Sequence, residues 1–311
     1  MPIVSPGKMD FSKKNIIMIL SGLPGTGKTT LALSAPDVLL IDTDEGLARV
    51  NPAHRKDASV CKTYEEILAD IKEARGQYKT IVIDTCGALI EYMKDWAVRT
   101  DPKASKANGG FSLQGYGVIK SEFVRLSADL RKDFNVIYLF HESMTKNGDE
   151  GVFYELVVEG STRTLVYQPA DLAGHLFIDH GKRYVGFTPT EQYSAKAAYG
   201  IKGIIEIPEL KDGDPNDFLT RLFDKVRSNL AAETEQLNPQ RDAYTLAMNA
   251  GKKIIQFVAN PDDVPEAAKK IKELNHALTS EKELKDMLKK RVAELGIVWD
   301  RNAKVYKYAD Q

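Results

Sequence analysis

The stretch that decides the fold is Gly22-Leu-Pro-Gly-Thr-Gly-Lys28-Thr29, which matches the pattern G-x-x-x-x-G-K-[ST] at every fixed position. Glycines let the backbone turn with its N–H groups pointing inward, so that an anion can approach closely. The lysine of this pattern places a cation against outer phosphates, and the hydroxyl that follows can ligate Mg²⁺. The pattern therefore predicts a phosphate-binding loop with these nucleotide contacts: Gly22, Pro24, Gly25, Thr26, Gly27, Lys28, Thr29 and Thr30.

The sequence on both sides of this loop alternates between buried-strand and helix patterns. The apolar run 15–20 precedes the loop, and a short helix over 29–35 is expected to end at Pro36. Further strands are predicted at 38–41, 80–84 and 135–140, and further helices at 64–74, 89–98 and 118–130. This alternation predicts an α/β fold, a mainly parallel sheet with helices on both faces.

The pattern changes after residue 170. Short strands at 175–179, 183–187 and 204–207 predict an antiparallel edge to the sheet. The polar stretch 231–240 is interpreted as a linker. Helices at 241–259, 263–278 and 280–295 and a hairpin over 297–308 are expected beyond it. The predicted domains are therefore a core over 1–230 and a small helical and hairpin region over 231–311.

Composition excludes several classes of protein. The chain of 311 residues has 43 Lys and Arg against 44 Asp and Glu, so no field of the whole molecule draws it to nucleic acid, although a local basic patch remains possible. Its two cysteines, Cys61 and Cys86, exclude a disulfide framework and a zinc finger. The sequence has neither a signal-peptide pattern nor a membrane-spanning run, so we expect a cytoplasmic protein that does not bind membranes.

Acidic side chains and one histidine follow the predicted strands. Asp84 ends a buried strand, where ligands bind in parallel sheets, and is the candidate metal residue together with Thr29. Hydrolysis needs a group that orients or deprotonates water. Asp44, Glu45 and Asp42 are candidates in that order, and a merely solvated acidic turn is the alternative.

His141 ends the fourth predicted strand, where a polar group could sense a γ-phosphate. A histidine that caps a strand for structural reasons is an equal alternative. The remaining histidines have no ligand-like spacing and are interpreted as structural.

The order GLPGTGKTT, LLIDTDEGL, TIVIDTCGAL and NVIYLFHES resembles the RecA-type P-loop ATPase core over residues 12–230. It is most similar to the short, mostly phage-encoded RecA-like nucleotide-binding proteins, which include Sak-type single-strand annealing ATPases. The resemblance implies ATP and Mg²⁺ as cofactors, slow hydrolysis, and self-association into a ring or filament on single-stranded DNA. It also implies recombination or annealing in a phage-infected bacterium, with a single-strand-binding protein as a further partner.

The resemblance also assigns roles to individual residues. It implies that Asp44 is the catalytic base. A K-x-R-x-G segment of this group reaches the γ-phosphate of the neighbouring subunit, and Lys196 and Gly200 match it. Ala198 replaces the arginine, which argues against fast hydrolysis activated by a second subunit.

DNA contact in RecA-like proteins uses loops that correspond here to residues 99–117 and 143–163. The first combines basic and aromatic side chains, which suit a single strand, and the candidate contacts are Arg99, Lys103, Lys106, Phe111 and Tyr116. A flexible surface loop is the alternative. The second segment is too acidic to be a good DNA loop.

Other functions stay open. A helicase or helicase loader would share the fold, and a nucleotide-bound assembly protein would hydrolyse little. A small-molecule kinase is least supported, because no arginine-rich lid is found.

Overall fold

The structure is a computed structural model. It describes residue 11 and residues 13–106, 110–146, 151–158, 162–301 and 303–309. Contacts divide the chain into two compact units, one over Ser12–Asn229 and one that includes Leu230–Gln311, and each is described by itself.

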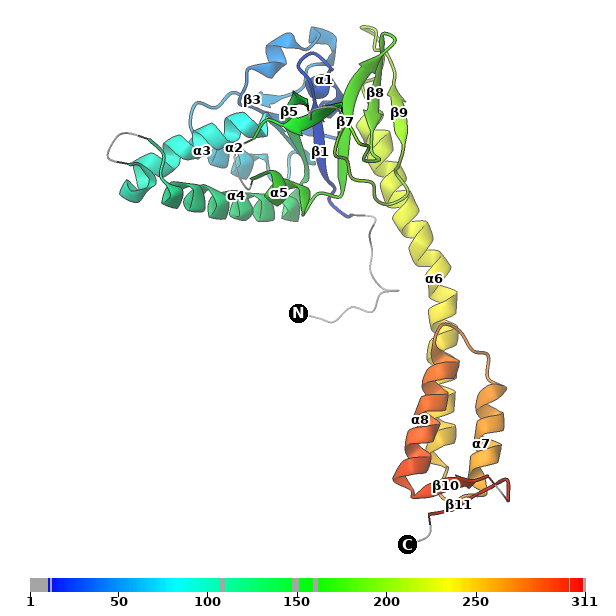
Figure 1. Ribbon diagram of the computed structural model, residues 1–311. Coiled ribbons are helices and arrows are strands. Elements are labelled where there is room, and N and C mark those ends of the chain that lie inside the picture. The colour runs from blue at the N-terminus through cyan, green and yellow to red at the C-terminus, as the bar shows by residue number, and fades with distance from the viewer. Residues whose placement is uncertain are drawn as a thin grey trace. The chain divides into compact units, whose positions relative to one another are not determined.

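A mixed sheet forms the first unit (Figure 1), and its strands lie in the order β3-β2-β4-β5-β1-β7-β8-β9. The bounds are β1 Ile17–Gly22, β2 Val38–Asp42, β3 Ala58–Ser59, β4 Thr80–Asp84, β5 Asn135–Lys146, β6 Val152–Leu156, β7 Leu172–Asp179, β8 Lys182–Gly186 and β9 Ile204–Ile207. The strands from β3 to β7 in this order pair in parallel, whereas β8 and β9 add antiparallel pairs and β6 pairs with the end of β5. The predicted mainly parallel sheet with an antiparallel edge is confirmed.

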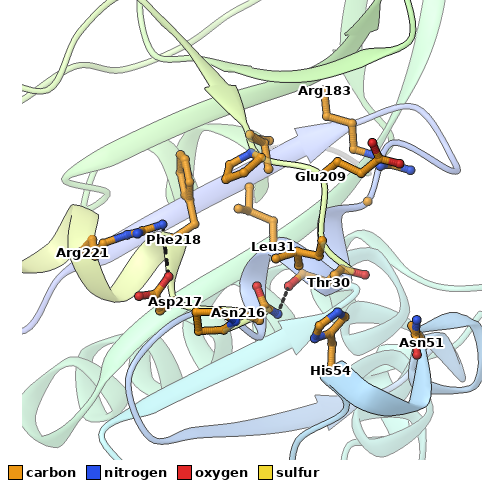
Figure 2. Close-up of a pocket in the computed structure, with 15 residues that line it drawn as sticks. Thr30, Leu31, Asn51, His54, Arg183, Glu209, Asn216, Asp217, Phe218 and Arg221 are labelled. Carbon is orange, nitrogen blue, oxygen red and sulfur yellow. Dashed lines mark hydrogen bonds and ion pairs between the residues drawn. The ribbon is translucent and has the colours of Figure 1, made fainter. Parts of the chain in front are cut away.

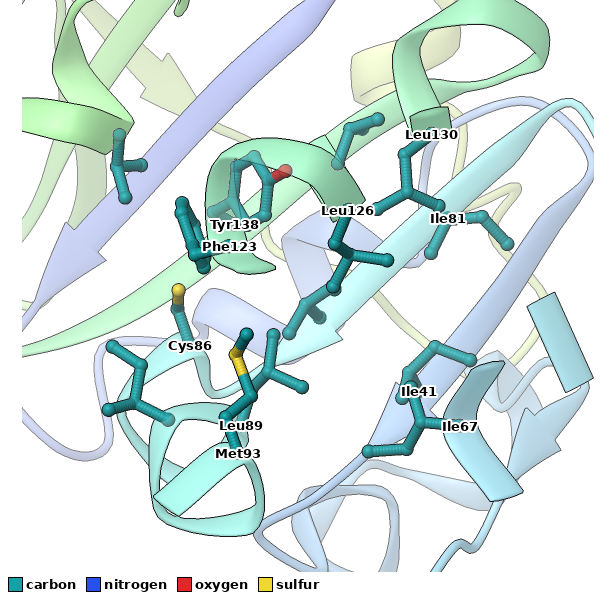
Figure 3. Packing of buried hydrophobic residues seen from close by; sticks show 14 of the residues in the cluster. Ile41, Ile67, Ile81, Cys86, Leu89, Met93, Phe123, Leu126, Leu130 and Tyr138 are labelled. Carbon is teal, nitrogen blue, oxygen red and sulfur yellow. The ribbon is translucent and has the colours of Figure 1, made fainter. Parts of the chain in front are cut away.

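Both faces of the central strands are buried, which explains their nearly continuous apolar sequence. One face packs on α2 (Tyr64–Ala74), α3 (Cys86–Thr100) and α4 (Leu113–Asp133) around a cluster that Figure 3 shows from close by. Met18 and Leu20 alternate with the cluster residues of β1 and are fully buried on the opposite face. There α1 (Lys28–Ala32) joins the start of α6 (Phe218–Gln256), where the Leu219 N–H donates to Ser34 Oγ.

Side-chain caps set where α3 and α4 begin, several residues before the predicted starts. The Thr85 hydroxyl accepts from the N–H of Ala88, and the Ser112 hydroxyl accepts from the N–H of Gly115. These caps satisfy backbone donors that a helix start leaves free.

The predicted linker over 231–240 is wrong. Helix α6 continues through it, with Pro239 inside the helix. The stretch AAETEQLNPQ contains mainly strong helix formers, so its polarity does not imply a loss of regular structure.

The region after His141 also differs from the prediction. Strand β5 continues to Lys146 and forms a hairpin with β6, and a short helix, α5 (Thr162–Tyr167), follows. Residues 141–146 are polar and mostly exposed, so they lack the apolar signal by which a buried strand is found.

The second unit contains the later part of α6 with α7 (Asp263–Lys272), α8 (Ser280–Glu294) and a hairpin of β10 (Ile297–Asp300) and β11 (Val305–Tyr308). Its core includes Val258, Ile271 and Leu284. Within the ranges described, no helix combines the length and apolar character needed to cross a membrane.

Two glycines of α4 allow a matched test of this packing. A Cβ atom at Gly115 would lie 2.7 Å from both the Ala104 carbonyl oxygen and the Phe111 ring, whereas one at Gly117 would meet nothing within 4 Å. We expect Gly117→Ala to raise the free energy of unfolding by about 0.5–1 kcal/mol, because alanine favours helix. Gly115→Ala should lower it by roughly 1–3 kcal/mol through overpacking. Urea unfolding measures both, and equal effects would contradict the packing described.

Candidate functional site

The phosphate-binding loop connects β1 to α1. Gly22 lies so close to β7 that a Cβ atom there would be 2.6 Å from the carbonyl oxygen of Leu176. Gly25 and Gly27 have φ angles of 82° and 93°, which favour glycine. Three other residues that the sequence predicts to contact the nucleotide lie in the same segment: Pro24 is exposed, Thr26 is buried and Thr30 is half-buried. Backbone geometry therefore accounts for the glycines of the motif.

Lys28 is buried, and its ammonium group folds back onto the loop. Its Nζ donates to the carbonyl oxygens of Gly22 at 2.9 Å and Leu23 at 3.0 Å. Burial lowers the pKa of Lys28, and the carboxylates of Asp84, Glu142 and Asp44 oppose that shift. A phosphate group would replace neutral carbonyls with an anion as partner and would favour the charged lysine.

Thr29 and Asp84 form the link between the loop and the end of β4. The Thr29 hydroxyl donates to Asp84 Oδ2 at 2.7 Å. Gly46 packs against this pair, because a Cβ atom there would lie 2.6 Å from Asp84 Oδ2. A hydroxyl and a carboxylate side by side are oxygen ligands that suit Mg²⁺. No group of three or more His, Cys, Asp or Glu side chains placed to hold a metal ion occurs in the described part of the chain.

Burial raises the pKa of Asp84. The hydrogen bond from Thr29 opposes this shift, whereas the carboxylates of Asp42 and Asp44 add to it. Asp84 is therefore a buried acid beside like charges, and a bound cation would relieve its energetic cost.

The three acidic candidates after β2 have different surroundings. The Asp42 carboxylate accepts from the N–H groups of Gly46 at 2.7 Å and Leu47 at 3.1 Å, so both its oxygens cap the short helix Gly46–Arg49. Glu45 is exposed and has a φ of 51°. Asp44 is the one that faces the end of β5.

His141 lies beside Asp44, with Nε2 3.4 Å from Asp44 Oδ2. Arg49 NH1 lies 3.6 Å from the same oxygen. Nδ1 of His141 is buried with no hydrogen-bond partner in the described structure. The geometry brings together Thr29, Asp84, Asp44 and His141, which the sequence placed on four separate segments.

Glu142 follows His141 and forms a buried pair that the sequence did not reveal. Its carboxylate lies 2.9 Å from Nδ1 of His175, and both side chains are 2% exposed. Tyr193 stacks on the His175 ring at 4.1 Å between centroids. The pair fixes the end of β5 that carries His141, and no sequence spacing could have predicted it because β5 and β7 are separated by β1.

Lys196 lies away from the phosphate loop of its own chain. The backbone of Lys196 pairs with Ala173 of β7, and Ala173 pairs with Ile19 of β1. Ile19 is three residues before Gly22 on β1, so the backbone of Lys196 lies level with a point about 10 Å from the start of the phosphate loop. The Lys196 ammonium group hydrogen-bonds the carbonyl oxygens of Tyr167 and Gln168, both at 3.4 Å.

The first candidate DNA loop lies at the far end of α3 from Asp84. Arg99 is paired with Glu65 at 2.9 Å, whereas Lys103 and Lys106 are exposed. Phe111 packs edge-on against Tyr116, with 5.0 Å between the ring centroids. The Phe111 ring therefore packs within the segment. Residues 107–109 of the segment lie outside the described residues.

Two cavities lie near the candidate site residues. One of about 550 Å³ opens beside Asp44 and His141, between the start of α3 and the β5–β6 hairpin. The other, of about 200 Å³, lies next to Gly27 and Thr30 and is lined from both sides of β1, by His54 after β2 and by Arg183 of β8 (Figure 2). Asn216 shapes the second cavity, because its amide donates to the Thr30 carbonyl oxygen at 2.9 Å. His54 lines it with a buried Nε2 that has no partner in the described structure.

The raised pKa of Asp84 predicts a change in stability on substitution. Above its folded pKa the ionised carboxylate is disfavoured by burial, so folding is less favourable as pH rises from the ordinary aspartate value through the raised one. Asp84→Asn should raise the free energy of unfolding without nucleotide by roughly 1 kcal/mol at pH 7.5. Chemical unfolding at pH 7.5 and near pH 4 measures the difference, which should vanish at the lower pH. A destabilised variant at neutral pH would contradict the buried-charge argument.

Comparisons with known proteins identify the family of the chain. Residues 14–199 match the family described as AAA domain. Among solved structures, the chain is similar to a prototypical ATPase from the type III secretion system of pathogenic bacteria, with 14% identity and a TM-score of 0.33 over 52% of this chain and 51% of that one, about half its length. A search of curated proteins gave no match. The family match covers more than half of the chain, which therefore belongs to the AAA domain family and contains an ATPase-like P-loop domain.

Proposed function

We propose that the protein binds ATP with Mg²⁺ at residues 22–30, hydrolyses it slowly, and acts as an oligomer on single-stranded DNA. The observation that carries the proposal is the 2.7 Å hydrogen bond between Thr29 and Asp84 beneath the phosphate loop. P-loop ATPases use such a hydroxyl and carboxylate to hold Mg²⁺ against the phosphates. When bound, the metal would neutralise charge that develops on the phosphate oxygens.

Asp44 is our choice for the catalytic base. It is half-buried beside His141, and neither oxygen caps a helix as those of Asp42 do. In this role Asp44 orients a water and accepts its proton, while the water oxygen bonds to the γ-phosphorus and the bond to the ADP oxygen breaks. His141 would hold Asp44 in place and contact the γ-phosphate.

A second subunit would complete the site. The cavity of about 550 Å³ beside Asp44 leaves the proposed γ-phosphate side open. Lys196 does not reach the loop of its own chain, so any contact with a γ-phosphate has to be made across a subunit boundary. Because Ala198 stands where the related group has arginine, we expect slow turnover.

The nucleoside would occupy the smaller cavity beyond Thr30. His54 is 4% exposed, and its Nε2 lacks a partner in the described structure. A buried polar atom without a hydrogen bond is costly, and a ribose hydroxyl or base edge would satisfy it.

The proposed DNA surface is the end of α3 and the loop that follows. Exposed Lys103 and Lys106 lie in the same segment as Leu113 and Tyr116, which are 86% and 41% exposed. Basic side chains suit the phosphates of a single strand, and exposed apolar or aromatic side chains suit its unstacked bases. Helix α3 begins beside Asp84 and ends at this segment about 21 Å away, so one rigid element joins the two proposed sites.

A nucleotide-bound assembly protein is the second candidate. Asp44 is already engaged by His141 and Arg49, and Ala198 removes one expected activating arginine. Both observations favour slow turnover, and measured hydrolysis separates the two functions.

Two substitutions test ATP binding and hydrolysis separately. Lys28→Ala should abolish binding of a fluorescent ATP analogue, because the buried ammonium group is lost. Asp44→Asn should keep the affinity within about threefold while lowering the hydrolysis rate about 10²–10⁴-fold. Phosphate release measures turnover, and Glu45→Gln is the control, with little expected change. Unchanged turnover in Asp44→Asn would exclude this residue as the base.

Charge at the proposed DNA surface gives a further test. The double substitution Lys103→Ala and Lys106→Ala should weaken binding of a labelled single-stranded oligonucleotide and lower the salt dependence by about 1.4 in the slope of log K against log[salt]. Fluorescence anisotropy with ATP and Mg²⁺ measures both. As a control, substitution of Lys269 and Lys270 of α7 by alanine should change neither the affinity nor its salt dependence. If the unsubstituted protein shows no detectable binding of the oligonucleotide, the DNA role is rejected.

A further inference from the structure

Arg183 lies against the phosphate loop from the strand β8, a position that the sequence did not single out. A Cβ atom built at Gly27 would be 3.3 Å from Arg183 Nε and 3.4 Å from its Cδ. Figure 2 shows Arg183 at the cavity that Gly27 and Thr30 also line. An arginine on the edge of the sheet thus reaches the loop of its own chain.

No hydrogen bond or ion pair joins the guanidinium group of Arg183 to a described residue, and the acidic side chain of Glu209 lines the same cavity (Figure 2). Its neighbour on β8 differs, because Lys182 pairs with Glu206 across the strands at 2.9 Å. Of two adjacent cations on one exposed strand, the one beside the phosphate loop is therefore available to an anion.

The cavity beside Arg183 is also lined by a buried polar atom that has no hydrogen-bond partner in the described structure. His54 is 4% exposed, and its Nε2 is buried without a partner in the described structure. The amide of Asn216 fixes the cavity wall through the Thr30 carbonyl oxygen. A nucleoside phosphate supplies what both groups lack, a hydrogen-bonding polar group for His54 and an anion for Arg183.

We propose that Arg183 binds a phosphate that ADP and ATP share, the α- or β-phosphate, in the nucleotide held by the loop of its own chain. This inference rests on the proposed ATP site. Sheet order excludes the γ-phosphate: Asp44 follows β2, Asp84 ends β4 and His141 lies on β5, all on one side of β1, whereas β8 lies on the other side with β7 between. The γ-phosphate belongs beside the first group, so a cation on the second side meets a phosphate that ADP and ATP share.

The position predicts a specific pattern of binding. Both phosphates are present in ADP and in ATP, so Arg183 would stabilise both complexes by a similar amount without contacting the γ-phosphate. It would therefore not replace the activating arginine that is absent at Ala198, and slow turnover would persist.

The test compares Arg183→Ala, Arg183→Lys and the matched control Lys182→Ala in titrations with fluorescent ADP and ATP. Arg183→Ala should weaken both nucleotides by the same factor, about ten- to a hundredfold, as expected for a lost charge-assisted hydrogen bond. Arg183→Lys should recover part of the affinity, and Lys182→Ala should stay within about twofold because its charge is already paired. Turnover of Lys182→Ala at saturating ATP should stay near that of the unsubstituted protein.

Several outcomes would overturn the assignment. The assignment is wrong if Arg183→Ala binds both nucleotides with affinities within twofold of those of the unsubstituted protein. It is also wrong if Arg183→Ala loses affinity for ATP but not for ADP. Tight ADP binding regained on mixing Arg183→Ala with Lys28→Ala chains would show that the arginine acts across subunits. If the unsubstituted protein binds neither nucleotide, the proposed ATP site fails, a result distinct from a null effect of Arg183→Ala.

Discussion

The hydrogen bond from Thr29 to Asp84 depends on the order of strands, and the rest of the site depends on it. These residues are 55 positions apart, and β5 separates their strands in the sheet. Only a parallel arrangement brings the end of β1 and the end of β4 to the same edge. The same edge carries Asp44 after β2 and His141 on β5, so one topological constraint assembles the candidate site from four distant segments.

This assembly has an energetic cost. Asp84 is buried near Asp42 and Asp44, and its pKa is raised by burial. Lys28 is buried as well, with a lowered pKa. Groups whose charged forms are disfavoured in the free protein gain most from a ligand that brings the opposite charges, here a cation for the carboxylates and a phosphate for the lysine. Function at this edge would thus be obtained at the expense of stability.

The sequence was sufficient for elements with a strong local signal. The buried strands, the phosphate loop and the mainly parallel sheet follow from apolar runs and from glycines that need positive φ. It was insufficient where tertiary context decides. The stretch 231–240 looks like a linker by polarity yet continues a helix, and the part of β5 after His141 is mostly exposed and carries few apolar residues. The sequence ranks Asp44 before Asp42, but only the structure shows that the Asp42 carboxylate accepts from the N–H groups of Gly46 and Leu47. The pair of Glu142 with His175, and the approach of Arg183 to Gly27, depend on strands that are not adjacent in sequence.

Two groups of side chains beside the phosphate loop have different proposed tasks. Asp44, Asp84 and His141 lie where the reacting phosphate would be, whereas Arg183 of β8 and His54 from the segment after β2 line the cavity next to Gly27 and Thr30. The most direct test of the central claim is a calorimetric titration of the unsubstituted protein with a non-hydrolysable ATP analogue, with Mg²⁺ and then with a chelator. The account predicts one saturable site per chain, with affinity at least about tenfold higher with Mg²⁺. Binding that is absent, or that is equally strong without Mg²⁺, would contradict it.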